Sequence, residues 1–411
     1  MIRCPWRRPI STVVISGILD GAINQDSEFS AMGHGIEQKH FANADEVVAT
    51  PTPSYPVYCL RPKVLVERAR RFQQLFPGRV LYAMKCNPHP LVLSALHAAG
   101  IVDFDTASLP EIAQVAESFP NATAYYMHPV KNRAAIKMSH LAYRVRHFVV
   151  DHITELDKLL DEVPSRELCI VVRLRTEPAP DTIYDLSTKF GCEIDTAVAL
   201  LKIIAAAGCE TGLAFHVGSQ CGSPQAYAAG LARVGAVIRD SGIMPSVIDV
   251  GGGFPAAYPN TPVPPLEDYM SAIRAGATSL ALPSSTMLMC EPGRALVADA
   301  VSLIVQVLLR KDDRLYVNDG IYGSLSEMFL SKLRLPVRLL ARGAGGVGPV
   351  QSFRLFGPTC DSLDVVPGNF ELPGNVAEGD WLEISQVGAY SNAMASRFNG
   401  FFPEIMLELA Q

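Results

Sequence analysis

The sequence lacks the features that mark exported, metal-stabilised, nucleic-acid-binding and membrane proteins. Its nine cysteines include no C-x-x-C pair and no Cys/His cluster at zinc-ligand spacing, so neither a disulfide framework nor a metal site is expected. Lysine and arginine form no blocks and the net charge is -6, which leaves no electrostatic footprint for nucleic acid. No stretch reaches the roughly 18 to 20 apolar residues of a membrane-spanning helix. We therefore expect a cytoplasmic protein that acts on a small molecule, with no metal, nucleic acid or membrane as partner.

Residues 1–45 carry no sustained hydrophobic periodicity and are predicted to be a disordered leader. Arginines precede a short apolar run at 13–19, but no convincing small-residue cleavage site follows, so export is not expected. The chain has 411 residues, of which 49% are apolar, and this exceeds the size at which one hydrophobic core keeps growing. Two globular domains are expected after the leader.

Short apolar runs alternate with helix-like segments through the first of these domains. The strand-like runs are 80–84, 102–104, 124–127, 148–150, 169–172, 212–217, 246–250 and 287–290. Strands separated by helices imply parallel pairing, and this many units favour a closed (β/α)8 barrel over a large doubly wound sheet. We assign this α/β barrel to residues 46–295.

After residue 295 the pattern changes to strand-like runs separated by Gly and Pro turns. These runs are 300–309, 335–340, 353–356 and 381–387. They predict a C-terminal β-domain, resembling a sandwich or a barrel, over residues 296–411. The extended segment 46–62 is a candidate for an additional strand of this domain.

Lys85 directly follows the first predicted barrel strand. Desolvation at that position is expected to lower its pKa and to suit the amine to imine formation. Taken alone, an ordinary lysine at a strand exit is the simpler interpretation. A barrel, however, gathers groups at the ends of successive strands on one face.

Two further groups follow later predicted strands. His216 offers an imidazole that can pack on a planar ring, and Ser219 offers a hydroxyl for a phosphate. The glycines at 251–253 let backbone N–H groups approach an anion closely. Singly, these features are explained as well by a histidine beside a tight turn and by a flexible glycine turn.

More candidates lie farther along the chain. Glu291 and Arg294 place a carboxylate and a guanidinium at a rigid turn, for which a structural ion pair is the alternative. The segment 357–364 carries the thiol of Cys360 and two acids, and Tyr390 ends a later run; a surface turn and simple packing are the alternatives. Together these groups supply an imine-forming lysine, a ring stacker, phosphate donors, a carboxylate and an acid.

This series resembles the ornithine/diaminopimelate/arginine decarboxylase family of pyridoxal 5'-phosphate enzymes, which share the alanine-racemase-like barrel of fold type III. The resemblance runs from about residue 53 to residue 410. Gly-Pro-Thr-Cys-Asp-Ser-Leu-Asp at 357–364 and the closing stretch 388–401 are similar to the ornithine/lysine decarboxylase branch. Diaminopimelate decarboxylases usually carry Cys-Glu-Ser in the former segment.

The resemblance implies a role for each candidate. Lys85 forms the Schiff base with pyridoxal 5'-phosphate, His216 stacks on the pyridine ring, and Glu291 holds the ring nitrogen. Asp105 and Arg173 line the cofactor pocket. The phosphate is bound by Ser219, Gly251, Gly252, Gly253, Arg294 and Tyr390.

The resemblance also implies a homodimer with shared active sites. Cys360 enters from the other subunit as the proton donor. Asp361 and Tyr322 contact the amino acid substrate, with Asp361 near its distal end.

The chain departs from the ornithine decarboxylase pattern at Leu330-Ser331, where a Tyr-Asp pair is usual. The missing aspartate removes one carboxylate that would pair the distal ammonium of the substrate, and Glu327 is a possible substitute. Gln220 is closer to the diaminopimelate and bacterial pattern. The departures concern selectivity and leave the cofactor chemistry in place.

Decarboxylation of ornithine and/or lysine, giving putrescine or cadaverine for polyamine synthesis, is the leading hypothesis. The alternatives are a decarboxylase of a modified or conjugated amino acid, or of diaminopimelate, in a specialised pathway. A racemase is disfavoured because Glu291, and not an arginine, is expected at the ring nitrogen. A non-catalytic, antizyme-inhibitor-like regulator is disfavoured because Lys85 and Cys360 are both present.

Overall fold

The computed structural model describes residues 41–49, 53, 55–164, 166–177, 182–183, 187–340 and 348–410. Residues 1–40 of the expected leader lie outside the described residues. Phe41 pairs with Leu409, and helix α1 (Ala44–Ala49) follows. Residues 41–45, which were expected to belong to the leader, are therefore part of the folded chain.

Parallel strands close into a barrel, which confirms the predicted (β/α)8 architecture. In order around the ring they are β2 (Arg79–Ala83), β3 (Asp103–Thr106), β4 (Thr123–Tyr126), β5 (His147–Val150), β6 (Cys169–Leu174), β7 (Glu210–Phe215), β8 (Val247–Asp249) and β9 (Met287–Cys290). Val80 of β2 pairs with Cys290 of β9, and this pairing closes the ring.

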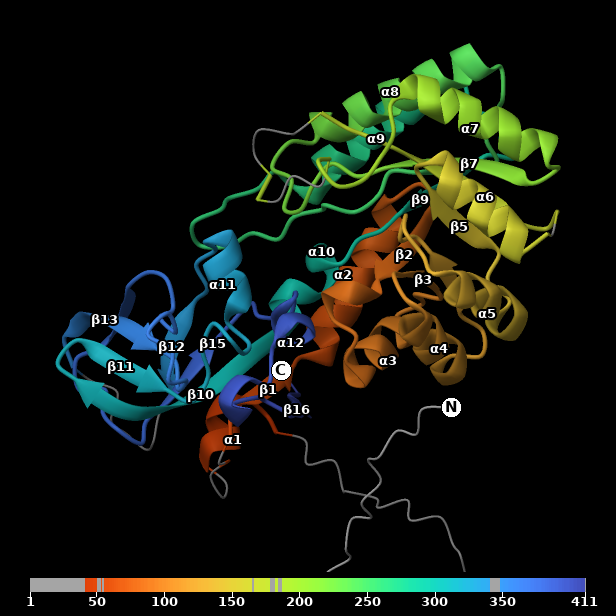
Figure 1. Cartoon of the computed structure of the whole chain (residues 1–411). Helices are drawn as coiled ribbons and strands as arrows, with labels where there is room; N and C mark the ends of the chain where they lie inside the picture. Colours follow the sequence, from red (N-terminus) through yellow and green to blue (C-terminus); the bar gives the residue numbers. More distant parts are fainter. Residues whose placement is uncertain are drawn as a thin grey trace, which may run out of the picture. The chain divides into compact units, whose positions relative to one another are not determined.

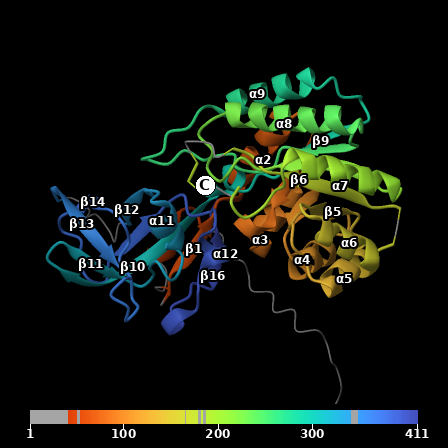
Figure 2. The same ribbon diagram turned by 45° about the horizontal axis from the view of Figure 1, so that its top comes forward.

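Helices cover the outside of the barrel (Figure 1). They are α2 (Pro62–Leu75), α3 (Pro90–Ala98), α4 (Leu109–Ser118), α5 (Arg133–Tyr143), α6 (Ile153–Glu162), α7 (Ile194–Ala206), α8 (Gln225–Ser241) and α9 (Leu266–Ser279). Figure 2 shows α8 and α9 side by side. Local sequence sets their starts: before α4, the Ser108 hydroxyl accepts a hydrogen bond from the Glu111 N–H, and Pro110 occupies the first turn.

Apolar side chains fill the inside of the barrel. The buried cluster there consists of Leu81, Tyr125, Met127, Val149, Cys169, Val171, Ala214, Val247 and Met289. The barrel is thus a packed core, and groups that act on a ligand are confined to its ends.

The C-terminal part forms a mixed sheet, which confirms the predicted β-domain. Its strands are β10 (Val301–Lys311), β11 (Arg314–Val317), β12 (Val337–Leu340), β13 (Val350–Phe356), β14 (Phe370–Pro373), β15 (Trp381–Ile384), β16 (Ile405–Glu408) and β1 (Val57–Leu60). From the N-terminal side, β1 pairs antiparallel with β10 and parallel with β16. The four-residue strands β11, β14 and β16 were not expected from the sequence.

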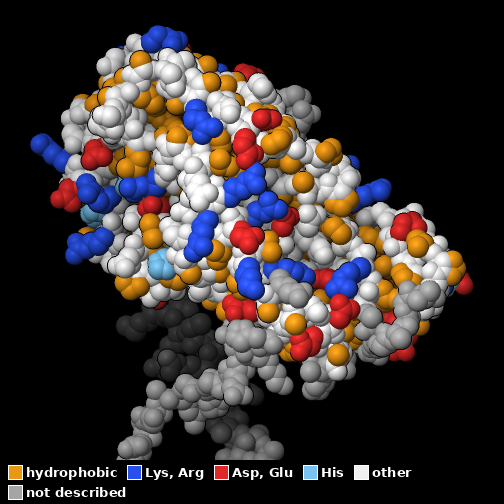
Figure 3. All heavy atoms as spheres, turned by 180° about the vertical axis from the view of Figure 1, so that it is seen from behind, with side chains coloured by type: hydrophobic (Ala, Val, Ile, Leu, Met, Phe, Trp, Pro, Cys, Tyr) orange, Lys and Arg blue, Asp and Glu red, His pale blue; other side chains and the backbone are white. Residues whose placement is uncertain are grey.

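Short helical segments carry several of the candidate residues or lie beside them. They are η1 (Met84–Cys86), α10 (Arg294–Val297), η2 (Ala298–Ala300), α11 (Ser326–Ser331), α12 (Ser391–Met394) and η3 (Phe398–Gly400). On the face seen in Figure 3, basic and acidic side chains are interspersed with apolar ones.

Candidate active site

The predicted barrel residues meet at the C-terminal ends of the strands. Lys85 lies on η1 just after β2, and Asp105 is in β3. Arg173 is in β6, His216 follows β7, and Glu291 follows β9. In a parallel barrel these positions share one face, which is where active sites of this architecture form.

Lys85 and Asp105 form an ion pair at this face, with Nζ 2.8 Å from Oδ2. The Asp105 side chain is 4% exposed and that of Lys85 is 44% exposed. Surrounding protein atoms displace water from the amine and favour its neutral form, but the carboxylates of Asp105 and Glu291 outweigh this effect and raise the pKa of Lys85. The expectation of a lowered pKa was wrong, because sequence position alone did not reveal the two carboxylates beside the amine.

Glu291 lies in a cluster of buried acids. Burial, together with the carboxylates of Asp105 and Asp249, raises the pKa of Glu291 well above its usual range. Burial also raises the pKa of Asp249 to about 6, although its Oδ1 accepts a hydrogen bond from the Gly251 N–H at 2.8 Å. The neighbouring carboxylates and the burial both favour the protonated form of Glu291. Glu291 is therefore suited to hydrogen bonding with a ring nitrogen.

His216 is held as a neutral imidazole. Its Nδ1 accepts a hydrogen bond from the Gly218 N–H at 3.1 Å, so the neutral ring carries its proton on Nε2. Burial, reinforced by the positive charges of Arg173 and Lys85, lowers the pKa of His216 well below its usual range. A neutral, oriented imidazole suits packing against a planar cofactor ring.

The glycine segment after β8 packs against the backbone that follows β7. A Cβ on Gly251 would lie 2.1 Å from the Phe215 carbonyl oxygen, and one on Gly253 would lie 2.2 Å from that of Gly218. Both glycines have positive φ, +70° and +96°, which side chains rarely tolerate. Glycine is therefore required for the close packing of this turn, which lies at the place where barrels commonly bind phosphate.

Arg294 lies beside this segment at the start of α10 and is 4% exposed. Its guanidinium donates to the Tyr258 hydroxyl at 3.1 Å and to the Ser219 hydroxyl at 3.5 Å. The guanidinium carbon lies 5.1 Å from the centre of the Tyr390 ring. Among the described residues, its buried Nε has no hydrogen-bond partner.

Glu327 makes a contact with Arg294 that was not predicted from the sequence. Its Oε1 lies 2.6 Å from the Arg294 guanidinium, and its side chain is 8% exposed. The carboxylate suggested as a substitute for the missing substrate-binding aspartate is thus paired with a cation of the protein in the single chain.

The candidates of the C-terminal part form a second group. The Tyr322 hydroxyl donates to Asp361 Oδ2 at 2.5 Å, and the Tyr322 ring packs on Phe398 at 4.9 Å. Cys360 is exposed, and its N–H donates to the Asn399 side chain at 3.1 Å. Within one chain, no hydrogen bond or ion pair between described residues joins this group to the barrel residues above.

Residues 63–298 match the family described as "Pyridoxal-dependent decarboxylase, pyridoxal binding domain". They are more than half of the 411-residue chain. The chain belongs to this family of decarboxylases. It is a pyridoxal 5'-phosphate-dependent amino acid decarboxylase, which confirms the family, the enzyme class and the cofactor predicted from the sequence.

Individual relatives agree with this placement of the decarboxylase. The lysine/ornithine decarboxylase of Selenomonas ruminantium is 33% identical over 80% of this chain and 83% of its own length. The solved structure of lysine/ornithine decarboxylase from Vibrio vulnificus, complexed with putrescine, has a TM-score of 0.77 at 30% identity, covering 89% of this chain and 99% of that one. Antizyme inhibitor 2 of Xenopus laevis is 30% identical over 82% of this chain and 77% of its own length.

The barrel mouth of the decarboxylase fits the cofactor. The buried Arg294 Nε without a partner suits a phosphate, and Glu291, whose pKa is raised, suits a ring nitrogen. Among the described residues there is no His, Cys, Asp and Glu cluster that could hold a metal ion. Within the same part of the chain, no helix is long and apolar enough to cross a membrane.

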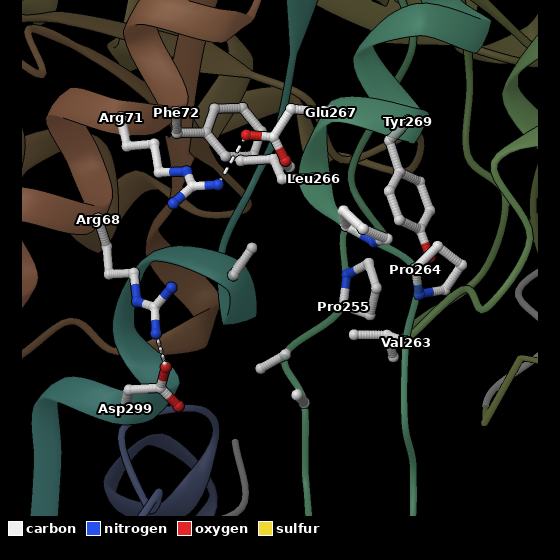
Figure 4. A pocket seen from close by; sticks show the side chains of 14 residues that line it. Arg68, Arg71, Phe72, Pro255, Val263, Pro264, Leu266, Glu267, Tyr269 and Asp299 are labelled. Atoms are coloured by element: carbon white, nitrogen blue, oxygen red, sulfur yellow. Dashed lines mark hydrogen bonds and ion pairs between the residues drawn. The ribbon is translucent and has the colours of Figure 1, made fainter.

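A separate hollow of about 280 Å³ lies between α2, the loop after β8 and the start of α9 (Figure 4). Arg71 faces Glu267 at 2.6 Å and Arg68 faces Asp299 at 2.5 Å, so its charged groups are already paired. None of the predicted cofactor residues lines this hollow. The decarboxylase site is defined by the convergent polar groups at the barrel mouth and not by this hollow.

Sequence reasoning missed Asp249 and Tyr258 and did not foresee the pairing of Glu327 with Arg294. Asp249 had a usable signal, because an acid at the end of a strand directly before three glycines lies at the barrel mouth. Tyr258 and Glu327 had none, because their contacts to Arg294 span 36 and 33 residues of chain.

Proposed function

We propose that this decarboxylase removes the α-carboxylate of ornithine and/or lysine and releases putrescine or cadaverine for polyamine synthesis. The observation that carries the proposal is the contact between Tyr322 and Asp361. Hydrogen bonds from the Leu363 N–H and the Tyr322 hydroxyl lower the pKa of Asp361, so this carboxylate is charged at neutral pH. A fixed negative charge suits the distal ammonium of a basic amino acid.

The barrel residues would hold the cofactor and keep it reactive. When bound, pyridoxal 5'-phosphate supplies an electron sink for the charge left when CO2 departs. Lys85 would anchor the cofactor through its amine, which Asp105 orients. Neutral His216 would pack against the cofactor ring, and Glu291 would hydrogen-bond to its ring nitrogen. Arg173 lines the pocket, and the phosphate is held by Ser219, Gly251, Gly252, Gly253, Arg294 and Tyr390.

The active site is shared between two subunits in this proposal. Cys360 of the partner subunit protonates the substrate Cα, and its neighbour Asp361 meets the distal end of the same substrate. Support comes from the exposed Cys360 thiol and from apolar side chains around it. Leu363, Phe398 and Phe401 are 64%, 41% and 39% exposed in the single chain, as expected of a surface that a second copy covers.

A substrate panel tests the proposal. Purified enzyme with pyridoxal 5'-phosphate is assayed for CO2 release from L-ornithine, L-lysine, L-arginine, diaminopimelate and L-norleucine. Norleucine is the matched control for lysine because it has the same carbon chain without the ammonium. We expect kcat/KM for ornithine or lysine to exceed that for norleucine by more than about 100-fold, since a charged hydrogen bond left unpaired is costly. Equal turnover of lysine and norleucine contradicts the proposed recognition.

Asp361→Asn supplies the complementary measurement. We expect it to raise KM for the basic substrate and to narrow the difference between lysine and norleucine, because it removes the negative charge and preserves the shape. An unchanged ratio shows that Asp361 does not meet the distal end.

A modified or conjugated amino acid is the second candidate substrate. It is favoured by Leu330, which is 50% exposed, and by the Ser331 hydroxyl, which donates to the Glu327 carbonyl oxygen. Neither side chain offers the carboxylate that a second ammonium contact needs. Turnover of an Nω-acylated lysine above that of free lysine supports this candidate.

A further inference from the structure

The ion pair of Arg294 with Glu327 is unusual in its position. Arg294 follows the last barrel strand, whereas Glu327 lies on α11 in the C-terminal part. Their side chains are 3% and 8% exposed and 2.6 Å apart. Burying two charges carries a large desolvation cost, so a pair in this place invites a functional explanation.

The same guanidinium faces the proposed phosphate site. It donates to the Ser219 hydroxyl at 3.5 Å, and its Nε is buried without a partner among the described residues. Two other cations at the barrel mouth, both among the described residues, face elsewhere. Lys85 pairs with Asp105, and Arg173 lies over the Phe190 ring at 5.5 Å.

A phosphate dianion beside Arg294 would place a second anion next to the Glu327 carboxylate. Two anions around one guanidinium repel each other, and the weaker acid responds by taking up a proton or by moving away. We propose that Glu327 competes with the cofactor phosphate for Arg294, so that cofactor binding is coupled to proton uptake by Glu327 and weakens as pH rises. The inference rests on the proposed assignment of the phosphate to Arg294.

Of the titratable groups beside Arg294, Glu327 is the one expected to change its protonation state when the phosphate binds. Arg294 stays charged, and burial raises the pKa of Tyr258 and Tyr390 above the usual value for tyrosine. Burial raises the pKa of the Cys86 thiol on η1 to about 12. Within the described helix α11 and its C-terminal cap, the only other charged residue is Lys332, which is exposed.

Glu327 is also suited to the exchange. Its burial raises the pKa of Glu327, and the charge and hydrogen bond of Arg294 only partly offset this. A bound phosphate would weaken the interaction of Arg294 with Glu327 and so raise the pKa of Glu327 further. At low pH Glu327 is protonated, and Arg294 pairs with the phosphate. At high pH the Glu327 carboxylate is charged and competes with the phosphate for Arg294.

The experiment uses pyridoxamine 5'-phosphate, which carries the phosphate but has no aldehyde, so the titration of Lys85 during imine formation does not enter. Binding to cofactor-free enzyme is measured by calorimetry between pH 7 and 9, where the phosphate is a dianion with a second pKa of about 6. Buffers of different ionisation enthalpy report the protons taken up. Wild-type enzyme is expected to take up protons on binding and to bind less tightly at pH 9 than at pH 7.

Glu327→Gln keeps the shape and removes the charge. It is expected to bind the probe about tenfold more tightly at pH 8, equivalent to one pKa unit of competition, and to lose the proton uptake. Glu327→Asp keeps the charge and is expected to retain proton uptake. Glu383→Gln is the matched control, because Glu383 is a buried carboxylate paired with Arg61 at 2.5 Å, and it is expected to leave the affinity unchanged.

The outcomes separate the inference from the proposed function. Absence of proton uptake by the wild type, or equal affinity of wild type and Glu327→Gln, overturns the competition. If Arg294→Met leaves phosphate affinity unchanged while borohydride still reduces pyridoxal 5'-phosphate onto Lys85, the assignment of the phosphate to Arg294 is wrong. If the wild type acquires no reducible adduct on Lys85, the proposed function itself fails.

Discussion

Lys85 Nζ lies 2.8 Å from the Asp105 carboxylate, and the register of two neighbouring strands brings them together. Ala83 of β2 pairs with Asp105 of β3, so the side chain of Lys85, two residues farther along on η1, reaches the carboxylate. The contact keeps the lysine protonated before the cofactor arrives. An imine forms only from the free amine, so under the proposed role of Lys85 this pair is expected to set the pH at which the enzyme captures its cofactor.

Replacing Asp105 by Asn is expected to shift cofactor capture to lower pH. The carboxylate of Asp105 raises the pKa of Lys85 against the effect of burial, so its removal lets the amine lose its proton earlier. Stopped-flow absorbance of imine formation across pH 7 to 10 measures the shift. Asp103→Asn is the control, since Asp103 lies at the other end of β3 with Tyr125 and Arg79. Identical pH profiles for wild type and Asp105→Asn would show that the ion pair does not control capture.

Lys85→Ala is expected to abolish the covalent link to pyridoxal 5'-phosphate. Wild-type enzyme with cofactor shows a visible band that borohydride removes, and the reduced cofactor mass is found on the peptide containing Lys85. Lys137→Ala, an exposed lysine on α5, is expected to keep the band. A reduced adduct on another lysine, in wild-type protein, excludes the assignment. A normal adduct on Lys85 without CO2 release from any amino acid instead supports a non-catalytic regulator.

Gly253→Ala is expected to lower both stability and cofactor affinity. The added Cβ would lie 2.2 Å from the Gly218 carbonyl oxygen, at a φ of +96°. Strain and overpacking together cost about 2 to 5 kcal/mol of unfolding free energy. Gly242→Ala is the control, because Gly242 has a φ of +71° with nothing within 4 Å of the new Cβ, and it costs about 1 to 2 kcal/mol. Urea denaturation compares the two; similar losses mean that crowding at Gly253 is relieved by a shift of the loop.

Mixing Lys85→Ala and Cys360→Ala chains is expected to restore activity that neither variant has alone. In a two-fold symmetric dimer with shared sites, random exchange leaves about a quarter of the sites intact. CO2 release is measured after subunit exchange at low protein concentration, with each variant incubated alone as the control. Failure to recover activity, with mixed dimers demonstrated by differently tagged chains, argues that each site is built from a single chain.

Much of the fold could be predicted because it depends on local pattern. Strand β9 spans Met287–Cys290, which is the range predicted from its apolar run. The short strands β11 and β16 were not visible. Each has four residues. β11 turns back along β10 and also pairs with β13, whereas β16 pairs with β1, which is far away in sequence.

The sequence by itself determined the order of the chemical groups along the barrel. It also showed that these groups follow the ends of strands, because a strand pattern depends only on neighbouring residues. Lys85, His216, the glycines at 251–253 and Glu291 could be found in this way. Only the tertiary structure decided which charges meet: Asp105 raises the pKa of Lys85, and Glu327 pairs with Arg294. The physical reason is that electrostatic energies depend on distance and burial in space, and neither is set by separation along the chain.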